Sequence, residues 1–147
     1  MPFNRTNLLF AILSIAYIAA IFLFADSPAV STVADYNPFS LLHIPLYAVL
    51  TLLIILSLLP LSRFRLLRDR VPAGSDGPGT PPYFHIIARS RLLIAGWVSV
   101  AVAGVDEYYQ SFIPTRKASL TDVLLDAVGI ALVVLLALRC IKWHKLT

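Results

Sequence analysis

Four long blocks of apolar residues constrain the fold of this chain more than any other feature. They run approximately over residues 8–25, 41–61, 92–112 and 120–140. A helix rises about 1.5 Å per residue, so roughly 20 apolar residues cross the ~30 Å hydrocarbon core of a bilayer. The pattern therefore predicts an all-α fold, an integral membrane bundle of four transmembrane helices.

The composition leaves little room for a separate soluble domain. Of the 147 residues, 59% are hydrophobic and 14% are charged, and the mean hydropathy is +0.81. A water-soluble protein would have to bury all four apolar helices beneath a polar surface that so short a chain cannot supply. We therefore expect one membrane domain that spans residues 1–147.

The first apolar block has an alternative explanation as the core of a secretory signal. Arg5 precedes the block and small residues follow it, as in signal sequences. However, signal cores usually have only ~7 to 15 apolar residues, and this block is longer. We favour a retained transmembrane helix.

The Lys and Arg residues predict which side of the membrane each end of the bundle faces. Ten of the twelve lie before the first block, between the second and third blocks, or after the fourth, whereas Arg116 and Lys117 lie between the third and fourth. Because cytoplasmic loops carry the excess of basic residues, both termini and the loop of about residues 62–91 should be cytoplasmic. The net charge of +4 thus reports topology and gives no reason to expect a nucleic-acid partner.

The predicted cytoplasmic loop and the single cysteine add two smaller expectations. Residues 71–82 are rich in Pro and Gly, which is typical of a flexible linker. Because Cys140 is the only cysteine, an intrachain disulfide is impossible, and we expect a packed or lipid-facing thiol. The sequence gives no oligomeric state.

Polar residues that are unusual in membrane helices gather at the outer ends of the second and third blocks. His43 and Tyr47 are four residues apart, so they share one helix face. In the third helix, Asp106 lies four residues before Gln110, and Glu107 lies three residues before it. Two carboxylates and an amide should therefore project from adjoining parts of one helix surface.

The fourth helix opens with a matching acidic face. Asp122 and Asp126 are four residues apart, and Gly129 continues their stripe. The link that precedes this helix is short and carries Arg116, so the third and fourth helices should be antiparallel neighbours whose polar faces meet. Gly129 would let the backbone of this neighbouring helix approach closely.

Each of these residues also has a purely structural explanation. Ser119 and Asp122 have the spacing of a helix capping box. Arg116 could simply pair with Glu107, and His43 could be an interfacial histidine with one hydrogen bond.

Taken together, the residues favour a polar pocket that opens outward over simple contacts between helices. A charged carboxylate at depth in a membrane helix costs of order 2.5 to 3.5 kcal/mol, and Asp106 and Asp126 lie inside their apolar blocks. If all four carboxylates were charged, Arg116 and Lys117 would leave two negative charges uncompensated. A proton, a cation, a water-filled cleft or a ligand with donor groups would have to supply the balance. There is no metal-spaced set of histidines and no phosphate-binding Gly loop, so we expect no metal and no cofactor.

At these residues the chain resembles the VanZ-like membrane proteins. The resemblance covers roughly residues 41–135 and rests on the motifs His43-x-x-x-Tyr47, Asp106-Glu107-x-x-Gln110, Pro114-x-Arg116 and Ser119-x-x-Asp122, followed by Gly129. The family often has an Asp-Lys pair before its histidine, where this chain has Phe39 and Ser40, and often Asn in place of Asp126. These two differences make the local electrostatics more acidic in this chain.

The resemblance implies a four-helix protein of the bacterial cytoplasmic membrane. The family is named for a member linked to low-level resistance to the glycopeptide teicoplanin, so we expect a role in envelope function or glycopeptide susceptibility. Membrane lipids would surround the protein, and an envelope lipid, a glycan or a peptidoglycan-related molecule would be its ligand. The expected ligand-site residues are His43, Tyr47, Asp106, Glu107, Gln110, Arg116, Asp122, Asp126 and Gly129.

Three classes of function remain open at this point. The first, which we favour, is an envelope binding or modulating protein in which Arg116 meets a phosphate or carboxylate and the acids accept donors. The second is a membrane-embedded enzyme acting on a lipid-linked substrate, with Glu107 or Asp106 as general base and His43 as proton shuttle. The third is a small oligomeric transporter, which we rank last because the acids cluster outside the midplane.

Overall fold

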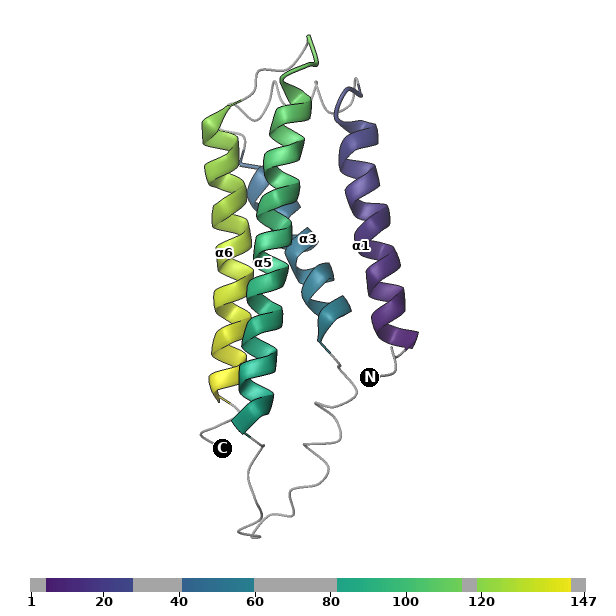
Figure 1. The fold of residues 1–147 in the computed structure, drawn as a ribbon. Helices are drawn as coiled ribbons and strands as arrows, with labels where there is room; N and C mark the ends of the chain where they lie inside the picture. The colour runs from purple at the N-terminus through teal and green to yellow at the C-terminus, as the bar shows by residue number, and fades with distance from the viewer. Residues whose placement is uncertain (1–4, 28–40, 60–81, 115–118, 144–147) are drawn as a thin grey trace.

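The computed structural model is all-helical in the residues that it describes, which are 5–27, 41–59, 82–114 and 119–143. Its helices are α1 (Arg5–Phe24), α3 (His43–Leu58), α5 (Pro82–Gln110) and α6 (Leu120–Trp143). Figure 1 shows α1, α5 and α6 aligned with the long axis of the molecule and α3 crossing it at an angle. The predicted all-α fold is confirmed.

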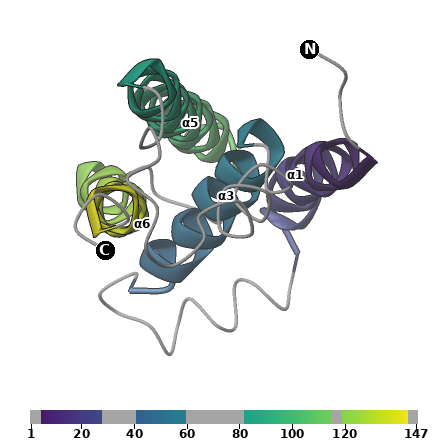
Figure 2. The same ribbon diagram turned by 90° about the horizontal axis from the view of Figure 1, so that it is seen from below.

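α3 is the central helix of the bundle. It packs against each of the other three helices, whereas α1 has few contacts with α5. The view in Figure 2 shows α3 running between the other three. α1 is tied to α3 by a hydrogen bond from the hydroxyl of Tyr17 to the carbonyl oxygen of Leu46, at 3.2 Å. Side chains on α3 are therefore positioned by the whole bundle.

Three of the helices are long and apolar enough to cross a membrane, and α3 is not one of them. The three segments are Arg5–Phe24, Ile86–Gln110 and Leu120–Ile141. α3 has 16 residues. At about 1.5 Å per residue it is roughly 6 Å shorter than a ~30 Å hydrocarbon core. The helix predicted over residues 41–61 is therefore present but shorter, and it is not among the three candidate spans.

The C-terminal end of α3 can lie inside the bundle because side chains from two other helices cap it. The last four carbonyl groups of a helix have no intrahelical donor, and an unsatisfied one costs several kcal/mol in hydrocarbon. Arg91 of α5 donates to the carbonyl oxygen of Leu58 at 2.7 Å. The amide nitrogen of Asn7 in α1 lies 2.9 to 3.3 Å from three further carbonyl oxygens, those of Leu56, Ser57 and Leu59.

α5 begins at Pro82, so residues 82–91, which were predicted to lie in a loop, are helical. Proline suits the first turn of a helix, where its missing N–H has no intrahelical partner. Ala88 and Leu92 are both buried, so the buried face of α5 extends into residues 82–91. Arg91, in this same stretch, contacts α3. The predicted linker at residues 62–81 lies outside the described residues.

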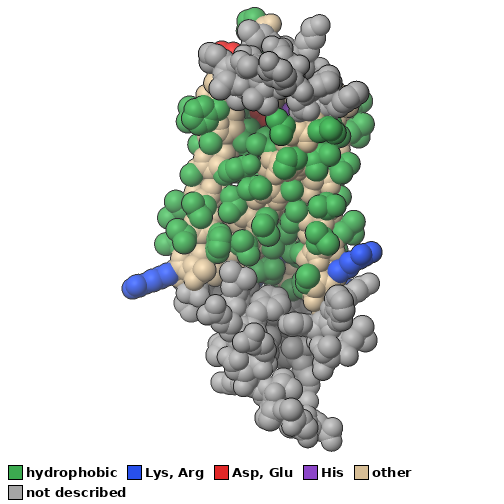
Figure 3. Space-filling model, turned by 180° about the vertical axis from the view of Figure 1, so that it is seen from behind, with side chains coloured by type: hydrophobic (Ala, Val, Ile, Leu, Met, Phe, Trp, Pro, Cys, Tyr) green, Lys and Arg blue, Asp and Glu red, His purple; other side chains and the backbone are tan. Residues whose placement is uncertain are grey.

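The interior of the bundle is narrow and its outer wall is apolar. Aliphatic and small residues fill most of the core, and Tyr47 and Leu50 of α3 are completely buried. Large apolar side chains such as Leu23, Trp97 and Leu135 point outward and are more than half exposed. Figure 3 shows hydrophobic side chains covering most of the described part of one face. An apolar surface of this extent is unusual for a soluble monomer.

Charged side chains are sorted between the two ends of the bundle. The described basic side chains lie at the end of the bundle where α1 and α5 begin and α6 ends: Arg5, Arg89, Arg91 and Arg139. Figure 3 shows two basic side chains, in blue, at this end. The described acidic side chains all lie at the opposite end: Asp26, Asp106, Glu107, Asp122 and Asp126. The chain therefore has a basic end and an acidic end, as its sequence predicts.

Candidate functional site

Seven of the nine predicted site residues meet at the acidic end, and each is at most 9% exposed. α3, α5 and α6 supply them, from helix positions three or four residues apart that share a face. The seven are His43, Tyr47, Asp106, Glu107, Gln110, Asp122 and Asp126. We call six of them the acid cluster: His43, Tyr47, Asp106, Glu107, Asp122 and Asp126.

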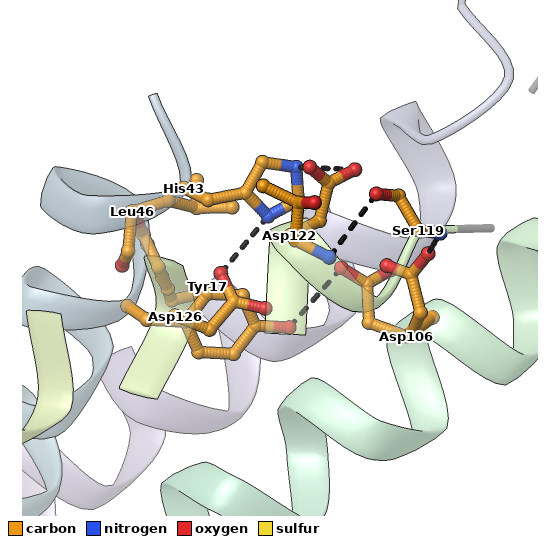
Figure 4. Close-up of polar contacts among 10 residues, drawn as sticks. Tyr17, His43, Leu46, Asp106, Ser119, Asp122 and Asp126 are labelled. Carbon is orange, nitrogen blue, oxygen red and sulfur yellow. Dashed lines mark hydrogen bonds and ion pairs between the residues drawn. The ribbon is translucent and has the colours of Figure 1, made fainter. Parts of the chain in front are cut away.

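His43 joins α3 to two aspartates of α6 (Figure 4). Its Nδ1 atom lies 2.9 Å from Oδ1 of Asp126, which is a hydrogen bond. Its Nε2 atom lies 3.9 Å from Oδ2 of Asp122, which is too long for a hydrogen bond. Asp126 is 1% exposed, so solvent does little to stabilise its charge. The imidazole is therefore held between two carboxylates and bonded directly to one of them.

Tyr47 joins α3 to α5. Its hydroxyl donates to Oδ2 of Asp106 at 3.1 Å, and both side chains are buried. The other carboxylate oxygen of Asp106, Oδ1, is buried and has no hydrogen-bond partner among the residues that the structure describes. Buried polar atoms nearly always find a partner, so this oxygen is an exception within the described structure.

Glu107 caps α6 from the neighbouring helix. Its Oε1 atom accepts the backbone N–H of Ser119, the residue before α6. The hydroxyl of Ser119 in turn accepts the N–H of Thr121 at 3.2 Å. In the capping box expected from the sequence, Asp122 would have accepted the Ser119 N–H, so that part of the expectation is wrong. Because Glu107 takes this role, Asp122 is free to face His43.

Gly129 allows α6 and α3 to approach closely. A Cβ atom at this position would collide with the backbone carbonyl of Ile44 and lie 3.2 Å from the backbone nitrogen of Ala48. The predicted close approach is therefore present, but the partner is α3 and not the third predicted helix, which is α5. Two helices can come this near only where one lacks a side chain. The contact holds His43 within reach of Asp126.

A pair of hydroxyl groups extends the polar contacts towards the middle of the bundle. Thr51 of α3 bonds to the hydroxyl of Ser99 in α5 at 2.9 Å, and neither side chain is exposed. Neither residue is among those predicted from the sequence. The signal was present, because Thr51 continues the face of His43 and Tyr47, and Ser99 lies seven residues before Asp106.

Carboxyl groups outnumber the single imidazole in the acid cluster. His43, Glu107 and Asp126 each lie close enough to Asp106 and Asp122 to interact with them electrostatically. The described Arg side chains lie at the opposite end of the bundle. The cluster can therefore accept hydrogen bonds and positive charge, and the His43–Asp126 pair can hold or pass a proton.

The remaining site predictions have different outcomes. Gln110 is buried beside the cluster on α5. Arg116 lies outside the described residues, and so does the predicted pairing of Arg116 with Glu107. Within the described ranges, His, Cys, Asp and Glu side chains form no group of three or more that could hold a metal ion.

Comparisons with protein-family models, with curated proteins and with solved structures find no match for this chain. The resemblance to the VanZ-like proteins therefore stays a prediction from the quoted motifs.

Proposed function

We propose that the protein is a multi-pass membrane protein whose acid cluster faces the outside of the cell and binds an envelope lipid, a glycan or a peptidoglycan-related molecule. Three helices of sufficient length and an apolar wall support the membrane location. The sorting of acidic and basic side chains supports the orientation, since basic residues favour the cytoplasmic side.

The observation that carries the binding proposal is the unpartnered oxygen of Asp106. Three other carboxylates of the cluster face donors of the protein: Asp126 and Asp122 face His43, and Glu107 accepts a backbone N–H. Oδ1 of Asp106 is buried without any such donor in the described structure. Leaving a buried acceptor unsatisfied costs about 1 to 3 kcal/mol, more for a charged group, and a bound ligand with donor groups would remove that cost.

The distribution of buried polar groups favours binding at one end over transport across the bundle. Below the acid cluster, the polar contacts reach Thr51 and Ser99. Beyond them, the buried core consists mainly of apolar residues, among them Ile54, Ile55 and Leu92. A carrier needs polar access from both sides, so this apolar layer favours binding over transport.

An enzymatic role is the second candidate, and the His43–Asp126 hydrogen bond is the observation that favours it. A carboxylate that binds one ring nitrogen sets the histidine tautomer and leaves the other nitrogen for proton transfer. Asp106 and Glu107 are the remaining catalytic candidates. Glu107 is engaged as the cap of α6, which leaves Asp106 as the better candidate for a general base.

The resemblance to VanZ-like proteins adds a link to teicoplanin susceptibility. On this proposal, expression in a susceptible host raises the teicoplanin concentration that inhibits growth, and Asp106→Asn cancels the rise. If the wild type and Asp106→Asn raise this inhibitory concentration equally, teicoplanin susceptibility does not depend on the acid cluster.

The orientation is tested with single cysteines and a membrane-impermeant maleimide on intact cells. Cys140→Ser removes the native thiol. Ser111 at the acidic end and Arg89 at the basic end are both exposed in the structure, so either position can report on access. In the Cys140→Ser background, Ser111→Cys should be labelled from outside the cell and Arg89→Cys should not. Labelling of Arg89→Cys alone would invert the topology, and the proposal of an envelope ligand would fail.

A further inference from the structure

We propose that the acid cluster recognises a primary ammonium group carried by an envelope molecule. This inference rests on the proposed function and names the chemistry of its ligand. A primary ammonium occurs on the headgroup of an aminophospholipid and on small water-soluble amines, and both would present the same donor atoms to Asp106.

The hydrogen bonds within the cluster show which kind of group is missing. A hydrogen bond already joins His43 to Asp126, the Tyr47 hydroxyl donates to Asp106, and the Ser119 backbone N–H donates to Glu107. Oδ1 of Asp106 remains an acceptor without a donor in the described structure, and the side chain is 2% exposed. An ionised carboxylate accepts hydrogen bonds and donates none, so the complement of this atom is a donor.

The charges decide between a neutral and a cationic donor. The cluster contains four carboxylates, those of Asp106, Glu107, Asp122 and Asp126. Among its described side chains, His43 is the one that can become positively charged. A ligand hydroxyl would satisfy the oxygen but would bring no positive charge to the carboxylates. An ammonium group brings one positive charge and three N–H donors on one atom. A metal ion fits less well, because the described side chains form no group suited to hold one.

The surroundings favour a primary over a quaternary ammonium. Proteins that bind quaternary ammonium groups enclose the methyl groups with the faces of aromatic rings. In the acid cluster the neighbours are carboxylates, an imidazole bonded to Asp126, and Tyr47, which directs its hydroxyl at Asp106. Tyr108 and Tyr109 of α5 are 68% and 42% exposed and point out of the bundle. The cluster therefore offers hydrogen-bond acceptors, and the described residues around it form no aromatic cage.

The depth of the cluster favours a lipid as the source of the ammonium group. Tyrosines concentrate at the membrane–water interface, where lipid headgroups lie. Tyr108 and Tyr109 follow Asp106 and Glu107 directly and lie on the outer surface of the bundle. Phe112, also exposed, packs against Tyr108 with ring centroids 5.0 Å apart. An aminophospholipid headgroup would thus reach the cluster at its ordinary depth in the bilayer.

The test measures how well purified full-length protein retains lipids, by native mass spectrometry from mild detergent. The probes are phosphatidylethanolamine, phosphatidylcholine and phosphatidylglycerol with identical acyl chains. Phosphatidylcholine keeps the positive charge but has no N–H donor. We expect at least about tenfold stronger retention of phosphatidylethanolamine than of phosphatidylcholine, which is the ratio that one charged hydrogen bond provides.

Asp106→Asn is the test variant and Thr51→Val is its matched control. The Asn side chain keeps the size of Asp but loses the charge, so phosphatidylethanolamine retention should fall to the level of phosphatidylcholine. Thr51 is equally buried on α3 but lies outside the acid cluster, so its variant should keep the lipid preference. Melting temperatures of both variants identify any loss of fold.

The outcomes separate the inference from the function on which it rests. Equal retention of the two lipids by the wild type together with no binding of millimolar ethanolamine, or an unchanged preference in a folded Asp106→Asn variant, overturns ammonium recognition. If phosphatidylglycerol is retained through Asp106 instead, the inference fails while an envelope-binding function survives. Binding of millimolar ethanolamine by the wild type, lost in Asp106→Asn and accompanied by equal retention of the two lipids, would assign the ammonium group to a soluble amine. Inverted cysteine labelling would overturn the envelope orientation and leave the ammonium preference intact.

Discussion

The two ends of α3 are both buried among other helices, but their polar groups are matched to different degrees. At the C-terminal end, Asn7 and Arg91 supply donors to four carbonyl oxygens of the helix and its following residue. At the N-terminal end, four carboxylates surround one imidazole, and Oδ1 of Asp106 has no donor in the described structure. At the first end, neighbouring helices supply the donors, whereas at the second end the described structure has a buried carboxylate oxygen without a donor and no Lys or Arg side chain.

This difference teaches how to separate structural from functional polar groups in a small membrane bundle. Evolution tolerates buried, uncompensated groups where they bind or react, and natural proteins give up stability for them. Substitutions at the capped end should therefore reduce stability, and neutralising Asp106 at the acidic end should not.

The largest effect is expected for Gly129→Ala, which would push α6 away from the N-terminal end of α3. The added methyl group collides with backbone atoms of Ile44 that cannot rotate aside. Overpacking of this kind costs about 3 kcal/mol. The measurement is the free energy of unfolding in mixed micelles during titration with a denaturing detergent.

Gly104→Ala provides the matched control for that substitution. A Cβ atom at Gly104 has no neighbouring atom within 4 Å, so this variant should keep or slightly raise stability by up to about 1 kcal/mol. Equal losses for the two variants would show that the close contact between α3 and α6 does not exist.

A smaller loss is expected for Asn7→Ala, which would remove a cap from the C-terminal end of α3. Three carbonyl oxygens would lose a donor in a site of low polarity, and we expect about 2 kcal/mol of destabilisation. The same detergent titration measures it. Ser14→Ala is the control in the same helix, since its hydroxyl bonds only to Phe10 of α1 in the described structure. A loss no larger than that of Ser14→Ala would contradict the capping role of Asn7.

Thr51→Val is expected to cost about 1 kcal/mol, because it breaks the hydrogen bond between Thr51 and Ser99 at the boundary between the polar and apolar parts of the core. The double variant Thr51→Val with Ser99→Ala should cost less than the sum of the two single variants, since each removes the same bond. Additive losses in the unfolding titration would mean that the two hydroxyl groups do not interact.

The sequence predicted the helical fold and most of the acidic end because both depend on local periodicity. His43 and Tyr47, and likewise Asp122 and Asp126, share a helix face at a spacing of four residues, and the structure buries all four. The basic and acidic ends of the bundle could also be predicted, because they follow from the order of the apolar blocks along the chain.

The remaining features depend on contacts between distant segments, so periodicity could not reveal them. Asn7 caps carbonyl groups about 50 residues away in the chain, and this contact helps α3 to end at Leu58. Glu107 takes the place that the local motif assigned to Asp122 because α5 and α6 are adjacent. Both outcomes require knowledge of which helix end lies beside which side chain.

The comparison between the two ends of α3 is tested most directly by the stability of Asp106→Asn in the absence of added ligand. The substitution removes a buried charge and keeps an oxygen that can accept the Tyr47 hydroxyl. If the acid cluster is a ligand site, the melting temperature of Asp106→Asn in detergent should equal or exceed that of the wild type, and ligand retention should be lost. A fall in melting temperature as large as that of Asn7→Ala, with ligand retention unchanged, would make the acid cluster a structural joint like the other end of α3 and would contradict the account.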